Sequence, residues 1–195
     1  MKRRVFIAIN LPEEIKEELS SCREEINKFF SSFGDNFQPI RWTKKENLHI
    51  TLAFLGYLDD NKIKKVEDIL AEISQEASSF LVELSEICYG PKNEKIPRMV
   101  WVIGNKSKYF SELKEKLDKE LQEKISFHLE KRDFLPHITL GRIRKWQWKA
   151  IKPEERPEVE KNISLKFRVK SIELMESHLK RGGPEYTVIK SFQFP

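Results

Sequence analysis

The chain has 195 residues, of which 39% are hydrophobic and 11% aromatic, so it can bury a core and is not globally disordered. Lys and Arg number 36 against 31 Asp and Glu, a net charge of +5 that fits an anionic partner such as nucleic acid without requiring one. No apolar run is as long as a signal peptide or a membrane span, and Cys22 and Cys88 form no CxxC pair. We therefore expect a reduced, cytoplasmic protein without a membrane partner.

The predicted elements do not alternate one for one between strand and helix. In chain order we predict strands over residues 5–9, 40–42, 48–55, 80–87, 99–103, 135–143, 164–175 and 186–194. Helices are predicted from about residue 12 to the break at 34–36, from 59 to 77 and from 108 to 123. Residues 89–95 and 146–162 are expected to be irregular. This order disfavours a doubly wound parallel sheet and favours an α+β fold with antiparallel sheets and helices packed outside.

No Gly- or Ser-rich linker divides the chain, so we expect residues 1–195 to form a single domain with two lobes. The last two predicted strands are separated by a Gly-Gly-Pro turn and should pair antiparallel.

One tetrapeptide, His-Ile-Thr-Leu, occurs twice, at residues 49–52 and 137–140. The whole chain holds only four His and four Thr, so these two copies take half of each. Both copies lie in predicted strands, where alternate side chains share a face. His and Thr of each copy therefore face one side, and Ile and Leu face the other. If the two polar faces meet, they form a cleft with two imidazoles and two hydroxyls.

Two imidazoles and two hydroxyls suit the chemistry of a phosphodiester. One imidazole can accept a proton while the other donates one, and threonine hydroxyls can donate to anionic oxygens. The sequence has no Gly-x-Ser-x-Gly for acyl transfer, no P-loop and no His-x-x-x-His. Acyl transfer, nucleotide triphosphate hydrolysis and a metal centre are therefore disfavoured.

At these residues the chain resembles the 2H phosphoesterase superfamily, and within it the RNA 2′,3′-cyclic phosphodiesterases, also called 2′-5′ RNA ligases. Beside the two His-x-Thr motifs, the likeness rests on short segments spread over the chain. They are residues 4–9 followed by Leu11-Pro12, Arg41-Trp42 leading into residues 47–52, Phe54-Leu55-Gly56, residues 98–101, residues 136–142 and Gly183-Pro184-Glu185-Tyr186.

The resemblance implies a bilobal fold with two antiparallel sheets about a pseudo-twofold axis, and a groove between the lobes that needs no metal and no cofactor. By motif position, His49 matches the proton donor and His137 the proton acceptor. Thr51, Thr139 and Arg142 match the phosphate-binding residues. The implied partner is RNA with a 2′,3′-cyclic phosphate end, with tRNA fragments among the candidates, bound by a monomer.

Two alternatives remain open beside hydrolysis of the cyclic phosphate. The same site could join tRNA halves through a 2′-5′ bond, or it could bind RNA or nucleotides without catalysis. Two titratable groups favour catalysis, because a binding protein does not need them.

Residue parity raises a difficulty for Arg142. It lies five residues past His137, so a regular strand would point it to the opposite face, and a bulge near Gly141 is needed to turn it inward. The matching position in the first motif is Phe54, for which we expect a core role rather than base stacking.

The basic and aromatic stretch 142–149 fits either a single-strand contact or a solvated loop whose Trp side chains cover the core. His128 and His178 lack a Thr partner, and we interpret them as surface or packing residues.

Overall fold

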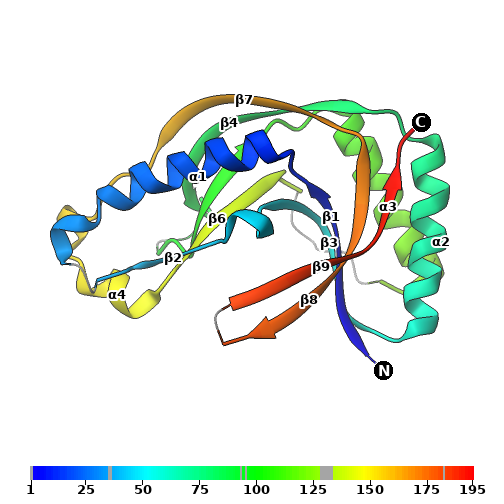
Figure 1. The fold of residues 1–195 in the computed structure, drawn as a ribbon, viewed down its shortest axis with the longest axis horizontal. Coiled ribbons are helices and arrows are strands. Elements are labelled where there is room, and N and C mark those ends of the chain that lie inside the picture. Colours follow the sequence, from blue (N-terminus) through cyan, green and yellow to red (C-terminus); the bar gives the residue numbers. More distant parts are fainter. Residues whose placement is uncertain (1, 35–36, 93, 95, 128–133, 182) are drawn as a thin grey trace.

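The computed structural model describes residues 2–34, 37–92, 94, 96–127, 134–181 and 183–195 and has the expected α+β class (Figure 1). The helices are α1 (Glu13–Lys28), α2 (Asp60–Glu76), α3 (Lys108–Ile125) and α4 (Lys145–Ala150). The strands are β1 (Arg3–Asn10), β2 (Ile40–Trp42), β3 (His49–Leu58), β4 (Phe80–Gly90), β5 (Met99–Gly104), β6 (His137–Ile143), β7 (Lys161–Val169), β8 (Ser171–Lys180) and β9 (Gly183–Gln193).

The strands follow one path, β7-β4-β5-β6-β3-β1-β8-β9, with β2 added on β6. The order is symmetric about its centre, since β6 and β3 each lead outward through three antiparallel neighbours. The two sheets expected from the sequence are joined into one, because β3 and β6 lie edge to edge and pair through Ile50 and Ile138. This one register pair places the two His-x-Thr motifs side by side.

The two faces of the sheet carry different clusters. Val5, Ile7 and Ile9 of β1 belong to the large core that the helices cover, whereas Phe6 and Ala8 belong to a small cluster on the other face. The alternation of a strand produces this division. The apolar residues of both motifs are buried in the large core, so the His and Thr side chains face away from the helices.

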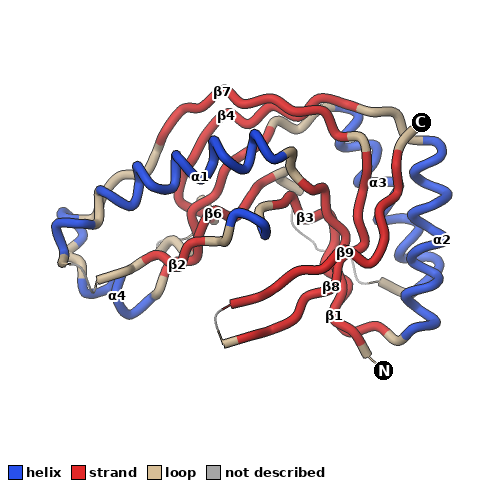
Figure 2. The backbone as a smooth tube through the Cα atoms, in the orientation of Figure 1, coloured by secondary structure: helices blue, strands red, loops and turns tan. Residues whose placement is uncertain are grey.

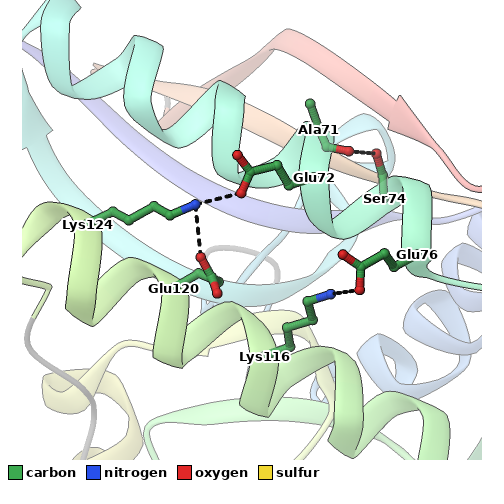
Figure 3. A network of polar contacts seen from close by, with 7 residues as sticks. All are labelled: Ala71, Glu72, Ser74, Glu76, Lys116, Glu120 and Lys124. Carbon is green, nitrogen blue, oxygen red and sulfur yellow. Dashed lines mark hydrogen bonds and ion pairs between the residues drawn. The ribbon is translucent and has the colours of Figure 1, made fainter.

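Helices α2 and α3 pack side by side at one end of the molecule (Figure 2). Each begins at a residue whose side chain accepts a backbone N–H, Asp59 for α2 and Ser107 for α3. Lys124 links them by a 2.6 Å contact to Glu72, and Lys116 pairs with Glu76 (Figure 3). These ion pairs are solvent-exposed and add little stability, so the buried apolar rows hold the helices together. In the described residues no helix is both long and apolar enough to span a bilayer.

Two expectations for the C-terminal third were wrong. The strand predicted over 164–175 is two strands that separate at Lys170, because β7 pairs with β4 while β8 pairs with β1. The segment predicted as irregular over 146–162 contains α4, which the burial of Trp148 stabilises against the core. The expected terminal pair is present as β8 and β9, and this hairpin projects from the sheet (Figure 2).

Candidate active site

Both His-x-Thr motifs line a single pocket of about 240 Å³ at the junction of β3 and β6. Its lining includes all five residues that were predicted from the sequence as site residues, which are His49, Thr51, His137, Thr139 and Arg142. The β2 segment and the β8–β9 hairpin complete its walls. The further lining residues are Arg41, Trp42, Thr43, Lys44, Asn47, Phe54, Met99, Gly183, Pro184 and Tyr186.

His49 is held by hydrogen bonds at both ring nitrogens. Its Nδ1 lies 2.7 Å from the carbonyl oxygen of Asn47, which can only accept, so Nδ1 carries the proton. Its Nε2 lies 2.9 Å from Thr51 Oγ1 and accepts from that hydroxyl when the ring is neutral. Phe6 and Tyr186 pack against the ring at centroid distances of 5.1 and 5.3 Å. The imidazole is therefore fixed in one orientation and one tautomer.

Burial lowers the pKa of His49 from 6.5 to about 4, because the charged ring would lose its hydration. The hydrogen bond to the Asn47 carbonyl opposes this shift, and the positive charges of His137, Lys16 and Arg142 add to it. At neutral pH His49 is thus uncharged, and its Nε2 lone pair accepts the hydrogen bond from Thr51.

His137 is oriented in a corresponding way. Its Nδ1 lies 2.8 Å from the carbonyl oxygen of Leu135, again two residues upstream. The indole of Trp101 lies against the ring with centroids 4.1 Å apart and planes tilted by 32°. Gly90 makes room for that indole, since a Cβ there would lie 2.3 Å from a Trp101 ring carbon. Each imidazole is therefore set by a backbone carbonyl and by aromatic packing.

A bulge in each motif strand explains which side chains reach the pocket. In β6 the register against β5 pairs Trp101 with Thr139 and Val100 with Gly141, so Leu140 is the extra residue. In β3 the register against β1 shifts in the same way, and Leu52 is the extra residue. Each bulge reverses the parity of the residues that follow it, which brings Arg142 into the pocket, as the sequence required.

The same parity change corrects the expectation for Phe54. Its side chain is 62% exposed and lines the pocket, so it is not a core residue. The bulge at Leu52 turns Phe54 to the face that holds His49 and Thr51. The two halves of the site thus differ at this position, with an aromatic ring on one side and a guanidinium on the other.

Apart from Arg142, the residues of the stretch 142–149 and the two other histidines lie outside the pocket or outside the described residues. In the stretch 142–149, Arg142 lines the pocket, Trp146 is exposed, and Trp148 is buried against Phe30 and Tyr89. His178 is exposed on β8 and lies 3.3 Å from Thr187. His128 falls outside the described residues.

Sequence reasoning assigned no role to Asn47, Met99 or Tyr186, which also line the pocket. Each stands within a segment that carried the family resemblance, which was the one signal that could have singled it out. Asn47 has a structural task, because its Nδ2 donates to the Pro184 carbonyl at 2.8 Å and ties the hairpin to the first motif. Among the described residues no group of three or more His, Cys, Asp or Glu is placed to hold a metal ion.

An antiparallel α+β fold whose two halves each bring a His-x-Thr pair to a shared pocket defines a phosphoesterase of the two-histidine class. The chain belongs to the LigT-like phosphoesterase family, whose model matches residues 9–101 and 103–186, which confirms the resemblance found in the sequence.

Relatives of this chain agree with that membership. It is 33% identical to the RNA 2′,3′-cyclic phosphodiesterase of Methanocaldococcus jannaschii, with 97% of this chain and 99% of the relative aligned. It is 32% identical to the Thermotoga maritima protein of the same name, with coverages of 98% and 95%. Escherichia coli LigT complexed with phosphate superposes with a TM-score of 0.70 at 26% identity, covering 99% of this chain and 98% of that one.

Proposed function

We propose that this protein hydrolyses RNA 2′,3′-cyclic phosphate ends to 2′-phosphomonoesters by two-histidine acid–base catalysis. The observation that carries the proposal is the single pocket that holds both imidazoles and both threonine hydroxyls. The names of the M. jannaschii and T. maritima relatives and the phosphate in the E. coli LigT complex support the substrate class. RNA ends, tRNA fragments among them, are the expected substrates.

The reaction divides naturally between the two halves of the site. His137 accepts a proton from the attacking water, whose oxygen forms a new bond to phosphorus. The P–O3′ bond breaks, and His49 donates a proton to the departing O3′ oxygen. Thr51 and Thr139 donate hydrogen bonds to the non-bridging oxygens, and Arg142 balances their charge.

Because burial lowers the pKa of His49 to about 4, the ring must gain its proton when substrate binds. An anionic phosphate beside the ring favours the imidazolium and raises that pKa. Protonation of Nε2 also requires the Thr51 hydroxyl to turn from donor to acceptor, which frees its proton for a phosphate oxygen. Substrate binding and proton uptake are therefore coupled.

This coupling predicts that binding of a cyclic nucleotide near pH 6 takes up protons. Calorimetric titration in buffers of different ionisation enthalpy measures the uptake directly. We expect net uptake in the wild type and a smaller uptake in His49→Gln. Binding without proton exchange in the wild type would contradict the assigned role of His49 as proton donor.

The mechanism is tested by removing each imidazole in turn. We expect His49→Ala and His137→Ala each to lower kcat for a cyclic-phosphate oligonucleotide by about 10²-fold or more. The matched control is His178→Ala, an exposed histidine outside the pocket, which should keep wild-type turnover. Circular dichroism checks that each variant is folded. Wild-type turnover in either motif variant would refute the mechanism.

The same assay separates the alternatives. Addition of a 5′-hydroxyl oligonucleotide tests for a 2′-5′ ligated product, and affinity without any product would indicate a binding protein. We also expect turnover to persist in a chelator, since the proposed proton transfers and hydrogen bonds come from protein side chains. Loss of turnover on chelation would indicate a metal-dependent hydrolase instead.

A further inference from the structure

Two arginines stand directly opposite each other at one end of the pocket. In the antiparallel pairing of β2 with β6, Arg41 is the register partner of Arg142. Residues in such a pair project from the same face with Cβ atoms about 4.5–5.5 Å apart. Both side chains are exposed and both line the pocket. Lys44, whose nearest ion-pair partner is Glu46 at 4.0 Å, lines it as well.

Nothing in the described part of the chain neutralises this pair of guanidinium groups. No Asp or Glu described by the structure lies within ion-pair distance of either arginine, and Arg142 Nη1 instead lies 3.6 Å from the sulfur of Met99. Like charges opposite each other on neighbouring strands are destabilising. The positive charge of Arg142 reaches the reaction centre, because it contributes to the lowered pKa of His49. The arrangement therefore favours a bound anion.

The reacting phosphate alone does not need both arginines. A cyclic phosphodiester carries a single negative charge, and the pocket already offers it two threonine hydroxyls and Arg142. Arg41 comes from β2, outside the two motif strands, and so lies one strand spacing of roughly 4.8 Å beyond Arg142 on β6. That lateral displacement from the motif strands fits a second phosphate beside the reacting one.

The two ends of the pocket also differ chemically, as the base and the phosphate of a nucleotide do. Phe54 occupies the position in β3 that corresponds to Arg142 in β6, so one end is aromatic and the other cationic. An aromatic ring is a surface for a base, and guanidinium groups are suited to phosphate oxygens.

We propose that Arg41, placed beside Arg142, binds the phosphodiester that joins the terminal nucleotide to the one before it. The site then acts on RNA ends of two or more nucleotides in preference to a cyclic mononucleotide. This inference rests on the proposed function and adds the length of substrate that the site recognises.

The test compares three substrates in the wild type and in Arg41→Gln. The substrates are adenosine 2′,3′-cyclic phosphate, the dinucleotide ApA with a 2′,3′-cyclic end, and the same dinucleotide with an uncharged methylphosphonate linkage. We expect the wild type to favour the charged dinucleotide over the other two in kcat/KM. In Arg41→Gln, the ratio of kcat/KM for the charged dinucleotide to that for the mononucleotide should fall about tenfold. The corresponding ratio of kcat/KM for the methylphosphonate dinucleotide to that for the mononucleotide should change little.

Two further variants complete the design. Arg41→Lys keeps the charge and should restore part of the ratio, which shows that charge rather than fold is measured. Arg168→Gln removes an exposed arginine of β7 outside the pocket and should leave the ratio at its wild-type value. An equal loss on all three substrates in Arg41→Gln, or no change in the ratio, would overturn the inference. A wild type that hydrolyses none of them would refute the proposed function itself.

Discussion

At the scale of single residues, the burial of His49 makes the stability of the protein depend on pH. Its pKa is about 4 in the folded protein and 6.5 when exposed, so between these values the unfolded chain binds more protons. Stability is therefore lost as the pH falls from 6.5 to 4. A pKa difference of this size corresponds to about 3 kcal/mol in the free energy of unfolding.

The prediction is that the wild type loses up to about 3 kcal/mol more than His49→Gln over that pH interval. Urea denaturation of both proteins at pH 6.5, 5.5 and 4.0 measures it, because all other titrating groups are shared. Parallel losses in the two proteins would show that His49 is protonated in the folded state.

Residues 49–52 and 137–140 could be predicted as site residues because a repeated polar pattern on a strand is visible in the sequence alone. Phe54 could not be placed, because its direction depends on the bulge at Leu52. A bulge arises from the register against a neighbouring strand, which in this case lies more than 40 residues earlier in the chain. The rule that alternate residues of a strand share a face therefore fails just beyond each motif.

At the scale of elements, the contact of β2 with β6 depends on the absence of a side chain at Gly141. A Cβ there would lie 2.5 Å from Ile40 Cγ2 and 2.9 Å from a Trp42 ring carbon. We expect Gly141→Ala to push β2 away and to cost about 1–3 kcal/mol of stability. It should also lower kcat/KM, because Arg41 and Arg142 would separate.

The matched control for this substitution is Gly104→Ala on β5. Its Cβ would meet its nearest neighbours at 3.5 Å, an ordinary contact, so the cost in stability should be small. Thermal unfolding and the hydrolysis assay together measure both effects. Equal stability of the two variants would contradict the packing argument.

The errors in predicted elements have a common cause. Helix α4 has six residues and gains its stability from the burial of Trp148, a tertiary contact that periodicity does not reveal. The break at Lys170 separates strands with similar alternation, and only their partners, β4 and β1, distinguish them. The long helices were predictable because each carries its own apolar stripe and two of them have side-chain N-caps.

At the scale of the whole molecule, the β3–β6 junction is narrow but the core is continuous. The two halves of the sheet pair through Ile50 and Ile138, yet one buried cluster runs from β1 to β6 and includes residues of both motifs. Separation of the halves would expose that cluster to water. The geometry of the pocket and the integrity of the core therefore depend on the same junction.

This continuity predicts that the two halves unfold together. All four Trp residues lie on β2, β5 or α4, beside β6, so their fluorescence reports the second half, whereas far-ultraviolet circular dichroism reports the whole chain. We expect the two denaturation curves to coincide in urea. Ile138→Ala, which truncates a fully buried side chain, should lower the free energy of unfolding by about 2–5 kcal/mol. Both curves should then move to lower urea concentration together. A fluorescence transition at lower urea than the dichroism transition would mean that the halves are held together at the junction alone.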